Sequence, residues 1–318
     1  MKARIVRQRI LKRFCLFFSF FLLTAAAVLT EGCGKAGASP IALNWVHATL
    51  RVDNDAGKGG TGFLIIRRIS EKKGKVFLVT NKHVVGLDPE KRDEARFLTL
   101  YVNSRDEKGK VTGTSLQAPL VENGHKLWRQ HPDPNVDVLA VDVTSMINSH
   151  PHLQNQGADY SFFATPEVLK KEQITEGDEV LVLGYPLGLF HARIHSPLVR
   201  QGIIATKIGT PIQIRFRNSS GEWKRVEIPG FLVDAAILPG SSGSPVVLKP
   251  IIGRKIGHKI EMDLATPYLL GIISATETAS IRLMEEYSFP VLAGLGIVYD
   301  VTTIRATIEL FFAPESGR

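Results

Sequence analysis

The sequence Leu238-Pro239-Gly240-Ser241-Ser242-Gly243-Ser244-Pro245 sets a pair of serines between two glycines, at the start of an apolar strand predicted for Ser244 to Leu248. Glycine permits the tight turn that this spacing requires, and such a turn leaves successive backbone N–H groups pointing at one spot. Those N–H groups can stabilise a negatively charged oxygen beside a serine hydroxyl. The pattern therefore indicates a nucleophilic serine, although a polar turn that enters a strand has the same composition.

Two other segments supply the partners that such a serine needs. A strand is predicted to end at a short turn that carries His83, and Asp137 stands at the head of an apolar strand. An imidazole accepts the serine proton, and a carboxylate holds the imidazole in the required tautomer. Two further aspartates remain candidates for the third role, namely Asp133 in a turn and Asp142 on the opposite strand face at the far end.

The order His83, Asp137, Ser242 along the chain is the order of the chymotrypsin-like enzymes with a Ser-His-Asp triad. The sequence resembles the trypsin-like serine peptidases of the HtrA/DegP branch, which are bacterial-envelope enzymes without a disulfide requirement. The likeness covers about residues 45 to 310. It rests on five ordered segments: Gly60 to Phe63, Thr80 to Val85, Leu183 to Leu189, Arg200 to Ala205, and Asp234 to Ile237 running into Gly240 to Pro245.

The resemblance implies a mainly β fold of two six-stranded antiparallel barrels, with a C-terminal helix and the triad in the cleft between the barrels. In that arrangement Ser242 attacks a peptide carbonyl, His83 takes and returns the proton, and Asp137 orients the imidazole. The oxyanion hole is formed at Gly240, Ser241 and Ser242 by the N–H groups of the first and last residues. Ser241 and Ser244 remain minor alternatives for the nucleophile.

The resemblance also implies a substrate-binding region. Ala236, six residues before Ser242, is expected to form the floor of the primary specificity pocket. The segment Ser274-Ala275-Thr276 is expected to pair with the substrate backbone by strand addition. Because a floor without an aspartate cannot anchor Arg or Lys, we expect cleavage after small or medium aliphatic residues.

The apolar periodicity predicts twelve strands and two helices. The strands are Ala48 to Val52, Gly62 to Arg67, Lys75 to Thr80, Phe97 to Val102, Val136 to Val143, Glu179 to Leu183, Leu198 to Lys207, Gln213 to Arg217, Arg225 to Val233, Ser244 to Leu248, Tyr268 to Ser274 and Gly294 to Tyr299. The helices are Pro166 to Glu172 and Val301 to Phe312, and Asn218 to Gly221 is a predicted hairpin turn.

The predicted domain organisation is a signal or anchor segment over 1–32, a tether over 33–42, a protease domain over 43–312 and a tail over 313–318. Within the protease domain we expect a first barrel over about 43–147, a linker over about 148–175, a second barrel over about 176–300 and the helix 301–312. Only 76 residues follow Ser242, so we expect no peptide-binding PDZ module after the protease domain.

The N-terminus carries six basic residues and then Phe14 to Thr30, an uncharged run typical of a translocated segment. Leu29 to Cys33 resembles a lipoprotein cleavage box, with Gly32 before Cys33, but Thr30 and Glu31 depart from the usual pattern. Lipidation at Cys33, an uncleaved anchor and an ordinary cleaved signal all remain open. Each places the rest of the chain on the periplasmic side of a bacterial envelope, and the first two tether it to the membrane.

Composition excludes several classes of protein. The 318 residues are 44% apolar and 22% charged, which is ordinary for a globular chain. The net charge of +8 falls to +3 beyond residue 32, so no nucleic-acid-binding stripe is predicted. Cys15 and Cys33 are the only cysteines, which excludes a disulfide scaffold. No cofactor or metal site is predicted, and the histidines of the loops are expected to be solvent-exposed, namely His150, His152, His191 and His195.

Protein or peptide substrates are therefore the expected partners, and the oligomeric state is not predicted. The leading hypothesis is an exported serine endopeptidase that acts on envelope proteins. The alternative is a latent or inactive binding or scaffold protein with a protease fold, and a third option is an esterase-like acyl hydrolase, since the same triad cleaves esters.

Overall fold

The computed structural model describes residues 40–71, 73–86, 96–217, 222–250, 252–256, 259–264, 266–284 and 287–313. The predicted signal segment, Cys33, most of the tether, the turn Asn218 to Gly221 and the tail beyond Ala313 lie outside these residues. No helix in the described ranges has the length and apolar character needed to span a membrane.

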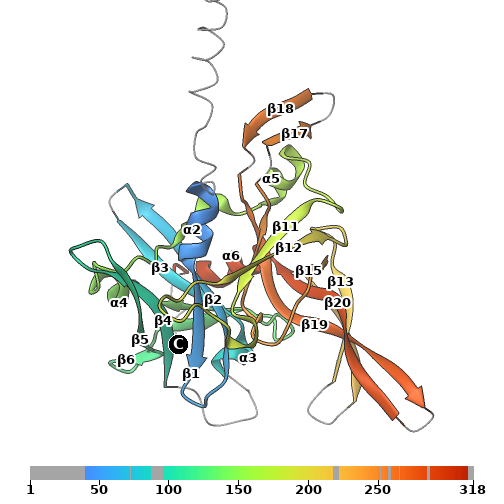
Figure 1. Cartoon of the computed structure of the whole chain (residues 1–318), viewed down its shortest axis with the longest axis horizontal. Helices are drawn as coiled ribbons and strands as arrows, with labels where there is room; N and C mark the ends of the chain where they lie inside the picture. The colour runs from blue at the N-terminus through green and yellow to red at the C-terminus, as the bar shows by residue number, and fades with distance from the viewer. Residues whose placement is uncertain are drawn as a thin grey trace, which may run out of the picture. The chain divides into compact units, whose positions relative to one another are not determined.

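The first half of the described chain forms one eight-stranded sheet (Figure 1). Seven strands follow the order β5-β4-β1-β2-β3-β9-β8, with antiparallel neighbours, and β10 pairs in parallel with β2. Their bounds are β1 Thr49–Asn54, β2 Gly59–Ser70, β3 Lys73–Thr80, β4 Phe97–Arg105, β5 Val111–Pro119, β8 Trp128–Gln130, β9 Leu139–Asp142 and β10 Ala158–Asp159.

The prediction of two six-stranded barrels is not confirmed for this half, where the described residues form an eight-stranded sheet. Its edge strands β5 and β8 do not pair with each other within the described residues. The chain between them forms the separate short hairpin of β6 (Val121–Glu122) and β7 (His125–Lys126), and β8 is only three residues long. In the described residues this sheet is not closed, and it has its own apolar core.

The second half forms one closed six-stranded barrel in the order β11-β12-β15-β20-β19-β16. The bounds are β11 Glu179–Gly184, β12 Leu198–Ile204, β15 Gly230–Asp234, β16 Pro245–Leu248, β19 Leu269–Met284 and β20 Tyr287–Asp300. Two hairpins lie outside the barrel, and their strands are β13 Ile212–Arg217 with β14 Trp223–Ile228, and β17 Ile252–Ile256 with β18 Lys259–Leu264.

Three strand predictions in this half are wrong in extent. The predicted strand Arg225 to Val233 is two strands, because Pro229 lacks the N–H that a continuous ladder needs. The predicted strands Tyr268 to Ser274 and Gly294 to Tyr299 belong to the long pair β19 and β20, which runs out well beyond the barrel (Figure 1).

Among the described residues, five helices and two 3₁₀ turns connect or cover the strands. They are α2 Pro40–Ala48, α3 Lys82–Val85, α4 Thr144–Asn148, α5 Pro166–Lys171, α6 Val301–Glu309, and the turns η1 Tyr160–Phe162 and η2 Pro186–Gly188. The two predicted helices correspond to α5 and α6, although α6 ends earlier than predicted. Asp300 begins α6, because its carboxylate accepts the Thr302 N–H at 3.0 Å.

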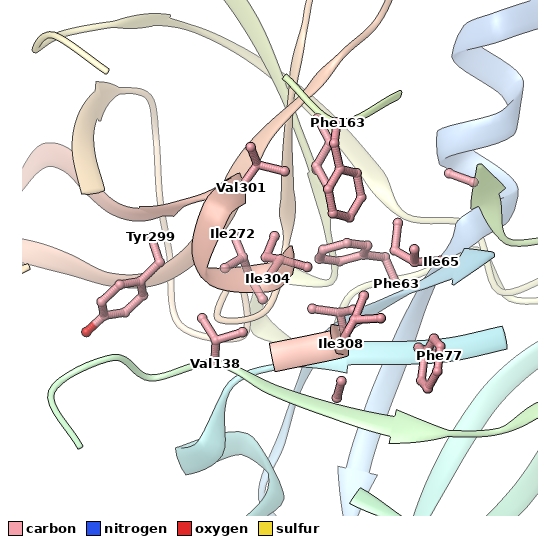
Figure 2. Packing of buried hydrophobic residues seen from close by; sticks show 14 of the residues in the cluster. Phe63, Ile65, Phe77, Val138, Phe163, Ile272, Tyr299, Val301, Ile304 and Ile308 are labelled. Carbon is pink, nitrogen blue, oxygen red and sulfur yellow. The ribbon is translucent and has the colours of Figure 1, made fainter. Parts of the chain in front are cut away.

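A shared apolar cluster joins the two halves (Figure 2). Phe63 and Phe77 come from the first sheet, Ile272 comes from the barrel, and Ile304 and Ile308 come from α6; each of the five is fully buried. Burying a side chain of this size stabilises the folded state by roughly 1.5–3 kcal/mol. The cluster therefore fixes the two halves against each other and sets the relative position of the segments described next.

Candidate active site

His83 stands on a single helical turn at the end of a buried strand. β3 ends at Thr80, and α3 then buries Val84 and Val85, which leaves the His83 side chain 52% exposed. Gly86 ends the turn with a φ of 82°, a conformation that glycine adopts readily. The His83 Nδ1 atom lies 2.5 Å from Asp137 Oδ2, and the His83 backbone N–H donates to Asp137 Oδ1 at 3.2 Å.

Asp137 lies in the loop before β9, between the buried residues Val136 and Val138. The Asn81 side-chain amide donates to the Asp137 carbonyl at 2.6 Å. The Ser274 hydroxyl donates to Asp137 Oδ2 at 2.8 Å. This carboxylate therefore accepts hydrogen bonds from both halves of the fold, and it holds the His83 imidazole with Nε2 facing away from it.

The Ser274 contact with Asp137 was missed by sequence reasoning, which assigned Ser274 to the substrate edge alone. The two residues lie 137 positions apart, and only the packing of the barrel against the first sheet brings them together. A second bond across the halves, from the Tyr299 hydroxyl to the Asn135 carbonyl at 2.7 Å, supports the same loop. Burial raises the pKa of the Tyr299 hydroxyl, so it remains a donor.

The other two aspartate candidates have different partners. Asp142 pairs with Lys75 Nζ at 2.9 Å and accepts hydrogen bonds from Thr144. Asp133 accepts hydrogen bonds from the backbone and side chain of Asn135, at 2.9 and 3.1 Å, and so closes its own turn. Of the three candidates, the structure brings Asp137 to His83.

Ser242 approaches this pair from the barrel side. Its hydroxyl donates to the Ser274 carbonyl at 2.9 Å, and within the described chain no hydrogen bond joins it to His83. The Ser242 carbonyl accepts the Thr61 N–H at 2.8 Å. A Cβ atom at Gly60 would lie 2.7 Å from Val84 and 3.1 Å from the Ser242 carbonyl oxygen. The β2 backbone therefore holds the Ser242 and His83 segments close together, and glycine is what makes this approach possible.

The residues before Ser242 form a tight turn. The Ser241 N–H donates to the Leu238 carbonyl at 3.0 Å, with Pro239 and Gly240 between them. Proline at the second position and a glycine with a φ of 89° at the third position are the signature of a type II turn. The N–H groups of Gly240 and Ser242 donate no hydrogen bond within the described residues, so both are available to a ligand oxygen.

The glycine after the serine is equally constrained. Gly243 has a φ of 87°, and a Cβ atom there would lie 1.8 Å from the Thr61 carbonyl oxygen. Ser242 is therefore presented by a backbone geometry that requires glycine at position 243.

Residues 60–250, more than half of the chain, match the family model of the trypsin-like peptidase domain. The chain belongs to this family. The match confirms the resemblance to trypsin-like serine peptidases that the motifs indicated.

Solved structures similar to this peptidase include the Rv3671c protease from M. tuberculosis in its active form, at 18% identity and a TM-score of 0.46, covering 88% of this chain and 87% of that one. The inactive form of the Rv3671c protease is similar at 18% identity and a TM-score of 0.46, covering 86% and 93%. Deg5 is similar at 13% identity and a TM-score of 0.47, covering 86% and 92%. No curated protein sequence matches the chain.

The neighbouring serines of the peptidase face elsewhere. Ser241 is 3% exposed, and its hydroxyl accepts the Leu238 N–H at 3.4 Å. Ser244 is fully buried, and a Cβ atom at Gly184 would lie 2.0 Å from its hydroxyl oxygen. Both hydroxyls are enclosed by the fold, whereas Ser242 is partly exposed and bonds to Ser274, the residue that supports Asp137, so the geometry favours Ser242.

Within the described residues, no strand pairs with the predicted substrate edge on the side away from β20. β16 pairs with β19 as far as Ile272, and Ser274 to Thr276 continue beyond that pairing while β20 occupies their other side. In the described residues, the Ser274 carbonyl on this edge is occupied by the Ser242 hydroxyl. Ala236 is exposed in the loop after β15, and its carbonyl accepts a hydrogen bond from the Arg200 guanidinium.

Among the residues that the structure describes, no three potential metal ligands lie together. His150, His152 and His191 are exposed, as expected. His195 corrects the expectation, because it is partly buried and packs against Tyr101 and Phe190 at ring distances of 5.3 and 4.9 Å.

Proposed function

We propose that this peptidase is an active serine endopeptidase that cleaves peptide bonds through an acyl-enzyme. The observation that carries the proposal is the His83–Asp137 pair, supported by Ser274 and placed beside a serine whose turn leaves two N–H groups free. These are the parts that acyl transfer needs: a base, a group that orients it, a nucleophile and oxyanion donors.

The catalytic cycle would begin with strand addition. A substrate strand pairs with the edge Ser274 to Thr276, and its N–H takes the Ser274 carbonyl that the Ser242 hydroxyl occupies in the free protein. The released hydroxyl then turns toward His83 Nε2. Substrate binding would thus complete the nucleophile and base pair, in keeping with the rule that catalytic hydrogen bonds often form only in the substrate complex.

The chemistry would follow in two steps, acylation and deacylation. Ser242 Oγ bonds to the peptide carbonyl carbon while His83 accepts the hydroxyl proton, and Asp137 stabilises the resulting imidazolium. The N–H groups of Gly240 and Ser242 bind the oxyanion, each worth about 3 kcal/mol of transition-state stabilisation. The C–N bond then breaks as the imidazolium protonates the leaving amine. In the second step, water attacks the ester carbonyl carbon while His83 accepts its proton. The ester C–O bond then breaks, the imidazolium returns the proton to Ser242 Oγ, and the carboxylic acid product is released.

The primary specificity pocket would have Ala236 as its floor and accept small or medium aliphatic side chains. Ala236 carries no charge to attract Lys or Arg, and the nearby Arg200 guanidinium repels both. A peptide library cleaved mainly after aliphatic residues would support this proposal, and cleavage after Lys or Arg would contradict it. A profile dominated by cleavage after Asp or Glu would indicate that Arg200, and not Ala236, determines the preference of the pocket.

Location is part of the proposal and rests on the sequence of the N-terminus. The basic segment, the uncharged run and Cys33 support export to the periplasmic side of a bacterial envelope, with a lipid or an anchor as the tether. Envelope proteins would then be the substrates. Membrane fractionation of cells that express the full chain, beside Cys33→Ser, tests this, because loss of membrane association only in the variant assigns lipidation.

One observation favours a second candidate function. The Ser242 hydroxyl bonds to Ser274 and not to His83, which is also what a latent or inactive binding protein with this fold would have. Fluorophosphonate labelling of the full chain beside Ser242→Ala separates the two functions. Labelling that is lost only in the variant supports the enzyme, and a folded protein that does not label supports the binding protein.

A further inference from the structure

A loop of the barrel, residues 188–196, docks on the first sheet near the active site. The Gly113 N–H of β5 donates to the Arg193 carbonyl at 2.9 Å. The side chain of Asn103 on β4 forms two hydrogen bonds of 2.8 Å with the backbone of His195. We call this segment the docking loop, because these bonds attach it to strands of the other half.

Arg51 of β1 lies at the centre of this contact. Its guanidinium forms bidentate hydrogen bonds to the Asp53 carboxylate, at 3.1 and 2.8 Å, and it donates to the Gly188 carbonyl at 3.3 Å. It also stacks over Tyr101 and Phe190, with distances to the ring centres of 4.9 and 5.6 Å. The hydrogen bond to Asp53 raises the pKa of Arg51, so the guanidinium stays charged.

The residue before Gly188 connects this cluster to the oxyanion turn. The Leu187 N–H donates to the Pro239 carbonyl at 2.7 Å. In a trans peptide the C=O and N–H point in opposite directions. Because the Pro239 carbonyl points toward Leu187, the Gly240 N–H points away from Leu187. That N–H is one of the two free donors beside Ser242.

Leu187 does not hold this position by itself. Its backbone has a φ of 55° and a ψ of 19°, a left-handed conformation that residues other than glycine rarely adopt. Its side chain is 61% exposed, so packing does not fix it. The hydrogen bonds around it supply the restraint, and among them the bond from Arg51 to Gly188 comes from the other half of the fold.

We propose that Arg51 is a positioning residue of the peptidase: it holds Gly188, and through Leu187 it keeps the Pro239–Gly240 peptide in the orientation that forms the oxyanion hole. Arg51 contacts none of His83, Asp137 and Ser242 within the described chain, so its effect passes through the backbone. The proposal rests on the proposed function for its catalytic consequence, but its structural part can be measured independently.

The structure offers a matched control. Arg67 of β2 has the same kind of surroundings, with Glu309 at 3.1 Å and guanidinium-to-ring distances of 5.3 and 5.4 Å to Tyr160 and Phe312. Its side chain bonds to Glu309 and to the Arg68 carbonyl, and within the described residues it makes no hydrogen bond to the docking loop or to the turn before Ser242. Arg51→Met and Arg67→Met therefore remove equivalent interactions in two places.

The experiment measures hydrogen exchange at Leu187 and kinetics on the full chain. In Arg51→Met, but not in Arg67→Met, we expect the Leu187 amide to exchange at least about tenfold faster. We expect kcat to fall by about tenfold to a hundredfold with KM nearly unchanged, since the loss of one whole oxyanion donor costs about 10²–10³. A peptide aldehyde, whose bound form carries an oxyanion, should lose affinity by the same factor as kcat/KM.

The outcomes separate this proposal from the proposed function. Unchanged exchange at Leu187 in folded Arg51→Met overturns the positioning role, and so does faster exchange with unchanged kcat. Faster exchange in Arg51→Met, together with a wild-type protein that shows no activity, leaves the Arg51 restraint standing and overturns the enzyme. If Arg51→Met fails to fold, Arg51→Lys keeps the charge but loses the fork to Asp53, and an intermediate loss in both measurements is then expected.

Discussion

The two halves of the candidate site are organised by different means. On the side of the first sheet, His83 and Asp137 are held by side-chain hydrogen bonds to a charged group, with Asn81 and Ser274 as supports. On the barrel side, Ser242 is presented by a backbone turn whose geometry depends on glycine, and its hydroxyl points away from the base. Under the proposed function, the acid–base pair is assembled in the free protein, whereas the Ser242 hydroxyl is not yet bonded to its base.

The largest effect should come from removing the nucleophile itself. Ser242→Ala should lower kcat by roughly 10⁶-fold, because the acyl-enzyme can no longer form. Stability should be almost unchanged, since the hydroxyl makes one partly exposed hydrogen bond. Steady-state kinetics and thermal melting of the variant beside the wild type check both statements. Residual activity within tenfold of the wild type would move the nucleophile to another residue.

The base side should be sensitive to the charge and the support of Asp137. Asp137→Asn should lower kcat by about 10⁴-fold, because the amide favours the wrong imidazole tautomer. Ser274→Ala removes only the bond to Asp137 Oδ2 and should cost about tenfold, since a hydrogen bond to a charged group is worth roughly 1.5–3 kcal/mol. Kinetics on both variants measure the difference, and a larger loss from Ser274→Ala than from Asp137→Asn would reverse the assigned roles.

The barrel side should be sensitive to backbone shape instead. Gly243→Ala would place a Cβ atom 1.8 Å from the Thr61 carbonyl at a φ of 87°. We expect a loss of about 2–4 kcal/mol in the free energy of unfolding, together with loss of labelling by a fluorophosphonate. Gly57→Ala is the control, because Gly57 also has a positive φ but has open space around it. Equal losses in both variants would show that close approach to Thr61 does not matter.

The smallest effect concerns pH and the docking loop. Burial, and then the neighbouring Arg51, lower the pKa of His195. Tyr101 of β4 packs against this imidazole and Arg51 of β1 is its charged neighbour, while Asp53 of β1 binds both Arg51 and Tyr101; Arg193 lies on the same loop as His195. Because the pKa is lower in the folded state, the stability contribution is complete above about pH 6.5 and is lost as the pH falls from there toward the lowered value.

Thermal melting across pH 7.5 to 5 tests this against His195→Phe, which keeps an aromatic ring but cannot take a proton. The wild type should lose more stability than the variant as the pH falls. Parallel losses in the two proteins would exclude His195 as the titrating group.

Sequence reasoning reached the parts of the molecule that local pattern determines. The turn at Gly240 and Gly243 and the strand end at His83 each follow from residues close together in the chain. The strand β5 (Val111–Pro119), at one edge of the first sheet, was not predicted, because it has little apolar character. The helix α2 was also missed, since its position depends on a distant contact, from Trp45 Nε1 to the Pro267 carbonyl at 2.8 Å.

The supports of the site were missed for the same reason. The bonds from Ser274 to Asp137 and from Leu187 to Pro239 join residues that only tertiary packing brings together. No residue pattern within a single segment records such a contact. For this chain, the sequence indicates which groups could react, and the packing of the two halves determines how they are held.

Intact-mass detection of a fluorophosphonate adduct on the full chain, beside Ser242→Ala, tests the central claim most directly. The probe bonds to a serine only where base and oxyanion donors are assembled around it. The account predicts a single adduct on the wild type that is absent from the variant. A folded wild-type protein that acquires no adduct, or a variant that still acquires one, would contradict it.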